Sequence, residues 1–373
     1  MKLSPPSQVL LRNVDELAGE RMLVIDSPGG EIGPLLSEHH PEARITLVQT
    51  QYSDYLRAKQ RIGGEENGPL HLRFCAWYAS PPRCHDVAIV YLPKSKAMLD
   101  LTLDMVAGVL APSGAVGPGA PGPARVLLVG PVRGGIKSGR PALERRFGTT
   151  AKLDGARRCA LYSATVTGPS DRESQLNDWG AERTFQIAGR PLKVFSYPGV
   201  FSHGRLDDGT RMLLETLDPT GWKTVPTHDG GVLDFGCGCG VIGAWIHACR
   251  PEARIEMVDS SALALEAARK TAALNGMPHD CVYPSNVLSD VGGRYGLIIS
   301  NPPFHAGFKT DYAVVQQFLR DAADRLVDGG ALRLVANRFH KYKPLIQNYV
   351  GPCRTVAEDA RYRVYEAVME RST

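Results

Sequence analysis

The sequence predicts two tandem α/β domains of the Rossmann-like type. Its 373 residues are long for a single hydrophobic core and suit two domains of ordinary size. Residues 41–45 recur identically as residues 251–255, an offset of 210 residues (251 minus 41). Residues 231–243 read as an apolar strand, a glycine-dense turn and the start of a helix, the unit from which open α/β sheets are built.

The composition is that of a globular protein, with 43% hydrophobic and 22% charged residues. The formal net charge of +4 permits a polyanionic partner without requiring one. Eight scattered cysteines, none in a CxxC pair, predict reduced thiols and a cytoplasmic location. We expect no signal peptide, because no apolar stretch follows the first lysine. No run reaches the roughly 18 apolar residues of a membrane span, so we expect no membrane association.

The internal repeat extends beyond the identical block. Three further pairs of segments correspond in the same order along the chain: 22–30 with 231–238, 85–94 with 295–304, and 110–115 with 326–331. Four matches in one order are not plausible as chance. The period is far longer than that of a solenoid, so the repeat indicates two copies of one domain.

The two copies differ where polar chemistry would lie. The second copy has Asp259 after its second strand, and the first has Gln49 there. The second has Asn301 where the first has Tyr91. The first copy therefore keeps the apolar strands and loses the polar site, and we predict that it is degenerate and non-catalytic. The expected boundaries are 1–165 for this copy, 166–190 for a linker and 191–373 for the catalytic copy.

A basic stretch lies near the end of the first copy, with Glu144 and Asp154 as its only acids. Two interpretations stay open: a solvated surface, or phosphate contacts to a nucleic acid. The residues that would make such contacts are Arg133, Lys137, Arg140, Arg145 and Arg146.

The segment Asn301-Pro302-Pro303-Phe304 follows an apolar run at residues 297–300. A strand cannot continue through two prolines, because proline has no N–H and its φ angle is fixed. The segment is therefore a rigid loop at the carboxyl end of a strand, where open α/β sheets bind ligands. Its amide and aromatic ring are suited to hydrogen-bonding and stacking on a planar nitrogen nucleophile.

A second ligand-binding signal lies in the glycine turn of the same copy. Asp234 ends the strand, and Gly236, Cys237 and Gly238 form a turn that lets the backbone approach a ligand closely. Asp259 ends the next strand and fits a pair of ribose hydroxyls, with a helix N-cap as its alternative role. The cysteines of the turn have no nearby Cys/His pair, so we expect no metal site.

These residues resemble motifs I to IV of S-adenosylmethionine-dependent methyltransferases that act on exocyclic amines. The matching segments are 234–238, Asp259, 285–287 and 301–304. Within that class the chain resembles the bacterial 16S ribosomal RNA guanine-N2 methyltransferases, which carry two tandem methyltransferase-like domains with only the C-terminal one active. Segments 198–202, 206–207 and 361–365 match as well.

The resemblance implies two class I methyltransferase domains and S-adenosylmethionine as cofactor. Gly236, Cys237 and Gly238 would pass under its methionine end, Asp259 would hold the ribose and Asn286 would contact adenine. In the catalytic loop, Asn301 and Pro302 would accept the N–H groups of guanine N2, Pro303 would stiffen the loop and Phe304 would stack on the base. His305 would be a proton acceptor or a polar loop group. The implied partner of this monomeric enzyme is 16S rRNA in the 30S subunit.

Three alternatives stay open at the level of the sequence. A similar loop, Asn-Pro-Pro-Tyr or Asp-Pro-Pro-Tyr, occurs in enzymes that methylate adenine N6 or a protein glutamine of release-factor type, so the four residues do not fix the substrate. Relatives with the same two-domain plan modify a guanine of 23S rRNA. A non-catalytic ribosome assembly factor could also retain a cofactor fold, although the presence of both Asp259 and Asn301 argues against it.

Overall fold

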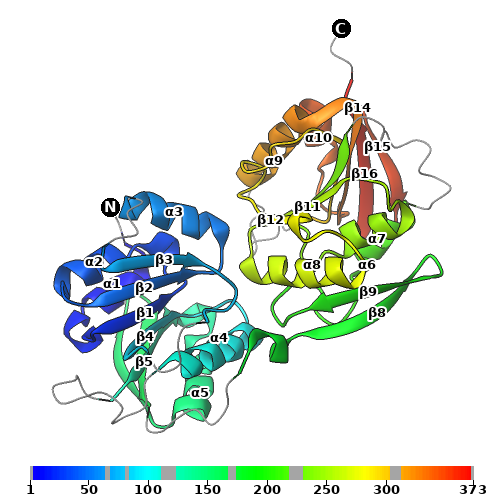
Figure 1. The fold of residues 1–373 in the computed structure, drawn as a ribbon. Helices are drawn as coiled ribbons and strands as arrows, with labels where there is room; N and C mark the ends of the chain where they lie inside the picture. The colour runs from blue at the N-terminus through cyan, green and yellow to red at the C-terminus, as the bar shows by residue number, and fades with distance from the viewer. Residues whose placement is uncertain are drawn as a thin grey trace. The chain divides into compact units, whose positions relative to one another are not determined.

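The computed structural model describes residues 3–63, 68–79, 84–110, 123–166, 174–217, 230–302 and 312–370. The chain divides into two compact units, Met1–Trp179 and Gly180–Thr373, and each is considered by itself (Figure 1). Among the helices of the described segments, none is long and apolar enough to cross a membrane.

The first unit carries a seven-stranded sheet in the order β3-β2-β1-β4-β5-β7-β6. The strands are parallel except β7, which is antiparallel to both its neighbours. The elements in chain order are α1 (Pro5–Leu11), η1 (Val14–Leu17), β1 (Arg21–Ile25), η2 (Pro28–Gly30), α2 (Gly33–His39), β2 (Arg44–Gln49), α3 (Tyr52–Ile62), β3 (Leu70–Phe74), β4 (Val87–Tyr91), α4 (Lys96–Val109), β5 (Arg125–Pro131), η3 (Val132–Gly134), α5 (Ile136–Phe147), β6 (Thr150–Ala156), β7 (Cys159–Thr165) and η4 (Leu176–Trp179).

The second unit repeats this architecture, with the order β12-β11-β10-β13-β14-β16-β15 and β16 antiparallel to its neighbours. A separate hairpin of β8 and β9 precedes the sheet in the chain. The elements are β8 (Ala181–Ile187), β9 (Arg190–Ser196), α6 (Asp208–Glu215), β10 (Gly231–Phe235), α7 (Val241–Cys249), β11 (Ile255–Asp259), α8 (Ala262–Leu274), η6 (His279–Cys281), β12 (Val282–Pro284), β13 (Tyr295–Ser300), α9 (Tyr312–Arg325), β14 (Leu326–Asn337), α10 (Lys343–Tyr349), β15 (Cys353–Glu358) and β16 (Tyr362–Val368). The identical strand order confirms the prediction of two class I methyltransferase folds in tandem.

Both sheets are covered by helices on two faces, which is why their central strands read as continuous apolar runs. In β1, Leu23 and Ile25 belong to one buried cluster, while Met22 and Val24 belong to another. The alternation follows from the period of two along a strand. In the second unit, Phe235 of β10 stacks on Phe318 of α9 with ring centroids 4.2 Å apart.

The expected linker at 166–190 differs from the structure, because it includes η4 and the whole of β8. The β8–β9 hairpin packs on α8, where the backbone N–H of Phe195 donates to Thr271 Oγ1 at 2.9 Å. Asn275 Nδ2 of the same helix region donates to the Lys193 carbonyl at 2.7 Å. A hairpin with one exposed, charged face carries too weak an apolar pattern to stand out as strands in the sequence.

Candidate active site

The predicted site residues of the second unit lie at one edge of its sheet. Strand β10 is hydrogen-bonded in parallel to β11 on one side and to β13 on the other. The carboxyl ends of these three strands therefore meet, and they carry Asp234, Asp259 and Asn301. The sheet topology brings together residues that are up to 67 positions apart in the chain (301 minus 234).

The turn after β10 depends on glycine for its conformation. Gly236, Gly238 and Gly240 have φ angles of 67°, 56° and 77°, in the left-handed region that disfavours other residues. A Cβ at Gly238 would meet no described atom within 4 Å, so the backbone there borders open space. A ligand can therefore approach the main chain closely at this point.

The two cysteines of the turn are buried, small side chains. Burial raises the pKa of the Cys239 thiol to about 11 and that of Cys237 well above its usual value. Both thiols therefore stay protonated near neutral pH in the ligand-free protein. Across the residues that the structure describes, no three His, Cys, Asp or Glu side chains gather as a metal site would require.

Asp259 binds the glycine turn directly. Its Oδ2 accepts a hydrogen bond from the Gly238 backbone N–H at 2.9 Å, and its Oδ1 accepts one from Ser261 N–H at 2.8 Å. The N-cap of α8 is Ser261, whose hydroxyl oxygen accepts from Ala264 N–H at 3.4 Å. Asp259 thus supports the start of the helix without being its cap. Burial raises the pKa of the Asp259 carboxyl.

Asp234 is fully buried and only half satisfied. Its Oδ2 accepts from the Gly243 backbone N–H at 2.9 Å, whereas no donor within the described part of the chain reaches Oδ1. Burial raises the pKa of this carboxyl to about 7. Buried polar atoms are ordinarily hydrogen-bonded, so Oδ1 calls for a further donor. The orphaned oxygen and the open glycine turn fit a bound cofactor that carries donor groups.

Asn286 follows the edge strand β12 and is exposed. Its backbone N–H donates to Asp290 Oδ2 at 3.1 Å, and the next residue, Val287, has a φ angle of 54°. The turn is thus held by local bonds while the Asn286 side chain faces outward. Its contact with adenine remains a prediction.

Asn301 is held by the start of α6. Its Nδ2 donates to Asp207 Oδ2 at 3.1 Å and to Thr210 Oγ1 at 2.8 Å. Pro302 is buried beside it. The remaining residues of the predicted loop, Pro303 and Phe304, and the neighbouring His305 lie outside the described residues.

The sequence assigned no role to Asp207 and did not single out Thr210. A signal was present, since an Asp at the N-cap followed by a second acid in the first turn, Asp208, is a common helix start. Asp207 is indeed the N-cap of α6, accepting from Thr210 N–H at 2.9 Å. Nothing in the sequence indicates that the same carboxylate also accepts from Asn301, 94 positions away.

The corresponding edge of the first unit has different side chains. Ile25 of β1 pairs with Val48 as Phe235 of β10 pairs with Val258, so the offset of 210 holds in the sheets. It equates Val24 with Asp234, Gln49 with Asp259 and Tyr91 with Asn301.

At each of these three positions, the side chain in the first unit is buried or hydrogen-bonded within that unit. Val24 lies in the apolar core. Gln49 Nε2 donates to the Ser27 carbonyl at 2.9 Å, which ties the strand end to its own turn. The Tyr91 hydroxyl and Ser7 Oγ are buried and hydrogen-bonded at 2.6 Å. The strand ends that form the candidate site in the second unit thus carry, in the first unit, side chains whose contacts lie within the unit itself.

The predicted RNA-binding side chains are partly engaged with neighbouring residues. Arg145 pairs with Asp100 at 3.2 Å, Arg146 with Asp104 at 2.7 Å, and Arg140 Nε donates to Thr150 Oγ1 at 3.0 Å.

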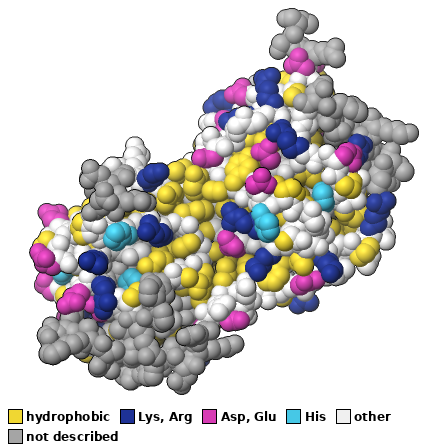
Figure 2. Space-filling model, viewed as in Figure 1, with side chains coloured by type: hydrophobic (Ala, Val, Ile, Leu, Met, Phe, Trp, Pro, Cys, Tyr) yellow, Lys and Arg dark blue, Asp and Glu magenta, His cyan; other side chains and the backbone are white. Residues whose placement is uncertain are grey.

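Arg133 and Lys137 are exposed. On the face drawn in Figure 2, the coloured Lys and Arg side chains are dispersed among acidic ones. RNA contact by this set remains a prediction.

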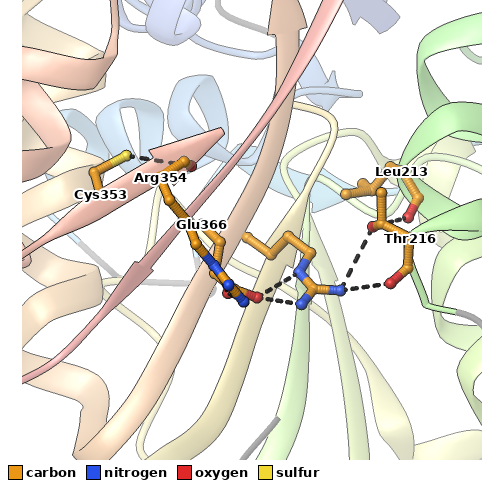
Figure 3. Close-up of polar contacts among 6 residues, drawn as sticks. Leu213, Thr216, Cys353, Arg354 and Glu366 are labelled. Carbon is orange, nitrogen blue, oxygen red and sulfur yellow. Dashed lines mark hydrogen bonds and ion pairs between the residues drawn. The ribbon is translucent and has the colours of Figure 1, made fainter. Parts of the chain in front are cut away.

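A buried ion network anchors the other end of α6. Arg333 of β14 is 3% exposed and Glu366 of β16 is 5% exposed, and the Arg333 guanidinium donates twice to Glu366 Oε2, once at 2.9 Å. Arg354 Nη2 donates to the other carboxylate oxygen at 2.6 Å. Arg333 Nη1 also donates to the Thr216 carbonyl at 2.9 Å, where α6 ends (Figure 3). The sequence analysis did not anticipate this network.

The fold and the site together define a class I, S-adenosylmethionine-dependent methyltransferase. Two family models agree: residues 7–182 match Methyltransferase small domain N-terminal, and residues 191–366 match Methyltransferase small domain.

The curated relatives are named ribosomal RNA small subunit methyltransferase C. The protein of that name from Hahella chejuensis is 36% identical over 98% of this chain and 99% of its own length, and that from Colwellia psychrerythraea is 34% identical over 98% of each. A structure of the T. thermophilus 16S rRNA N2 methyltransferase, solved with AdoMet and guanosine, has a TM-score of 0.81 at 24% identity, covering 98% of this chain and 92% of that one. The chain belongs to the ribosomal RNA small subunit methyltransferase C family. The predictions of family, fold and cofactor are confirmed.

Proposed function

We propose that this protein methylates the exocyclic N2 amine of a guanine in 16S rRNA, with S-adenosylmethionine as methyl donor. One observation supports the proposal above others. The Asn301-Pro302 segment follows β13, which pairs with β10, and Asp259 ends β11 on the other side of β10, so the proposed amine-binding and ribose-binding residues flank the glycine turn at the carboxyl ends of these strands. Chains named for small-subunit rRNA methylation are 36% and 34% identical to this one over 98% of its length.

The cofactor would be held by the strand ends and the turn. Gly236, Cys237 and Gly238 would lie under its methionine part, with Asp234 Oδ1 accepting a hydrogen bond from a donor group. Asp259 would accept from the ribose hydroxyls and Asn286 would contact adenine. When bound, S-adenosylmethionine supplies an electrophilic methyl group on a sulfonium.

The chain's own part in the chemistry is to hold and polarise the amine. Guanine N2 is a weak nucleophile because its lone pair is delocalised into the ring. Asn301 Oδ1 and the Pro302 carbonyl would accept its two N–H groups, and these bonds strengthen as positive charge develops on nitrogen. The new N–C bond would form as the S–C bond of the sulfonium breaks, with the thioether as leaving group, and the nitrogen would then lose one proton to water. A strong general base is not needed, because the alkylated nitrogen is acidic.

The loop also has to select and expose the base. Phe304 would stack on the guanine, and Pro303 would keep the loop rigid. The base must be unpaired or flipped before it can reach the sheet edge. The first unit would dock RNA, with Arg133, Lys137, Arg140, Arg145 and Arg146 as candidate phosphate contacts. We place the protein in the cytoplasm, acting as a monomer on the 30S subunit.

The test is where the methyl group goes. The full-length protein is incubated with tritiated S-adenosylmethionine and, in separate reactions, 30S subunits, 50S subunits and release factors. We expect label in 16S rRNA at one guanine, mapped by reverse-transcription arrest against RNA from a strain that lacks the protein. Label in 23S rRNA or in protein would assign the site to another acceptor. No label anywhere, with no binding of the cofactor by calorimetry, would indicate a non-catalytic assembly factor.

A further inference from the structure

The Asn301 side chain has one donating and one accepting end, and only the accepting end can bind an amine N–H. We propose that Asp207 and Thr210 are positioning residues that fix the orientation of the Asn301 amide, so that Oδ1 faces the substrate. The inference rests on the proposed function of Asn301 as an acceptor for the amine. It adds the N-cap residue of α6, Asp207, and Thr210 of that helix to the determinants of the reaction.

The chemistry of the contacts allows only one amide orientation. Asp207 as a carboxylate can accept but not donate, so Nδ2 of Asn301 must be the atom that faces it at 3.1 Å. The Thr210 hydroxyl donates to the same carboxylate oxygen at 3.4 Å, which leaves its lone pairs to accept from Asn301 at 2.8 Å. A flipped amide would place Oδ1 against the Asp207 carboxylate and lose that hydrogen bond, and the Thr210 hydroxyl could donate to Oδ1 only by giving up its own bond to Asp207.

The two acceptors are themselves held in place. Thr210 is 4% exposed, and its backbone N–H donates to Asp207 Oδ2 at 2.9 Å as part of the N-cap of α6. The far end of α6 is bound through the Thr216 carbonyl to buried Arg333.

On the strand side, Ser300, the residue before Asn301, is fully buried and donates through Oγ to the Phe235 carbonyl at 2.7 Å. Both sides of the contact thus belong to rigid elements, as a positioned catalytic group requires.

The consequence concerns the direction of the Asn301 dipole. With Nδ2 occupied twice by the protein, Oδ1 points away from α6 and is left to accept from the substrate. A flipped amide would instead present an N–H to the N–H of the amine, which is repulsive. Loss of either acceptor should therefore lower the rate of transfer and leave cofactor binding unchanged, because the hydrogen bonds described for these two side chains go to Asn301 and within the start of α6.

The first experiment separates the role of Asp207 as N-cap of α6 from its hydrogen bond with Asn301. Asp207→Ser retains a good N-cap residue but is too short to reach Asn301, and Thr210→Val removes the hydroxyl at nearly constant shape. We expect each to lower kcat on 30S subunits by roughly 10- to 100-fold, the range for losing a hydrogen bond to a charged or buried group, with KM for S-adenosylmethionine within about twofold. Asp207→Asn and Thr210→Ser keep an acceptor and should retain most activity.

The control variant is Asp208→Asn, which alters the neighbouring carboxylate of the same helix. Its side chain is 63% exposed and pairs with Arg361 rather than with Asn301. We expect its kcat to match that of the wild type. If Asp207→Ser and Thr210→Val also match the wild type, or if they lose cofactor affinity together with kcat, the positioning role is wrong.

A swap of donor and acceptor gives a sharper test. Asn301→Asp keeps an oxygen toward the substrate but sets a carboxylate against Asp207, so we expect a large loss of kcat. Adding Asp207→Asn supplies a donor to the new carboxylate, and the double variant should be several-fold more active than Asn301→Asp alone. Losses that simply add would overturn the inference.

A readout without turnover distinguishes this inference from the proposed function. The side-chain NH2 signals of Asn301 in 15N-labelled full-length protein are assigned by their absence in Asn301→Ala. We expect slow solvent exchange in the wild type and in Asp208→Asn, and faster exchange in Asp207→Ser and Thr210→Val. If the wild type shows this protection but labels no 16S rRNA, the proposed function fails and the amide orientation stands. Equal exchange in all variants would overturn the orientation.

Discussion

The Gly238 backbone N–H donates to Asp259 Oδ2 at 2.9 Å, so the turn after β10 is bound to the end of β11. One carboxylate thereby shapes the glycine turn and, as proposed, receives the ribose of the cofactor. The shared bond explains why an acid at this strand end serves the site better than the glutamine of the first unit. Gln49 donates through its amide to a carbonyl instead.

Replacing Asp259 should therefore weaken the binding of S-adenosylmethionine. Asp259→Ala removes the acceptor of Gly238 N–H and that of the ribose hydroxyls, and we expect the Kd for S-adenosylmethionine to rise by at least about 100-fold, as for two lost hydrogen bonds to a charged group. Isothermal titration calorimetry measures it. Glu252→Gln, on a side chain 70% exposed, is the matched control and should bind normally. A wild-type Kd in Asp259→Ala would remove this residue from the site.

Replacing Asn301 should lower turnover and leave cofactor binding nearly unchanged. Asn301→Ala removes the proposed acceptor of the amine, and we expect turnover to fall by at least about 100-fold while the cofactor Kd stays within a few-fold. Single-turnover methylation of 30S subunits and calorimetry give the two values. Asn286→Ala provides the contrast, because it should weaken cofactor binding. A large loss of cofactor affinity in Asn301→Ala would contradict the assigned role.

Asp234 should make the ligand-free protein less stable as the pH rises. Its folded pKa of about 7 lies above the ordinary value of 3.8, so the folded state holds a proton that the unfolded state releases between about pH 4 and 7. This group therefore lowers the free energy of unfolding by up to about 4 kcal/mol as the pH rises across that window. Above the window its contribution no longer changes with pH.

Urea unfolding of the ligand-free wild type and of Asp234→Asn at pH 5 and pH 8 tests this directly. Asp26, whose pKa is raised by burial to about 6, contributes with the same sign in both proteins and cancels in the comparison. The variant should gain stability relative to the wild type between the two pH values. A constant difference would show that Asp234 ionises normally in the folded protein.

The buried Arg333–Glu366 pair should contribute more to the free energy of unfolding than the exposed Arg354. Glu366→Ala leaves the buried Arg333 guanidinium without its carboxylate, and we expect a loss of roughly 3–5 kcal/mol in the free energy of unfolding. Arg354→Ala, at a side chain 67% exposed, should cost about 0–1 kcal/mol. Thermal and urea denaturation measure both. Equal costs would mean that Glu366 is stabilised by something other than Arg333.

One cofactor should bind per chain. The first unit has Val24, Gln49 and Tyr91 at the three site positions, and each is buried or hydrogen-bonded within the unit. Calorimetry of the full-length protein should therefore give a stoichiometry of one, unchanged in Gln49→Ala. A stoichiometry of two, reduced by that substitution, would refute the degeneracy of the first copy.

The fold could be predicted because its signals are local and occur twice. Apolar strands, a glycine turn and strand-end acids recur at a constant offset, and burial on both faces makes each central strand a plain apolar run. The β8–β9 hairpin was missed because Glu182, Thr184 and Gln186, at alternate positions of β8, give it one polar, exposed face. The Arg333–Glu366 pair was missed because charged residues in strands ordinarily suggest an exposed edge.

By itself, the sequence determined the tandem repeat, the family, and the residues Asp234, Asp259 and Asn301 at three strand ends. Those are properties of short segments, in which residue type and spacing dictate local conformation. Only the tertiary structure decided what each side chain binds. The donor end of Asn301 meets Asp207 and Thr210, which lie 94 and 91 positions away, because α6 packs on β14 and β16 of the same sheet. A hydrogen bond between such distant residues depends on how helices pack on the sheet, and no local pattern in the chain encodes it.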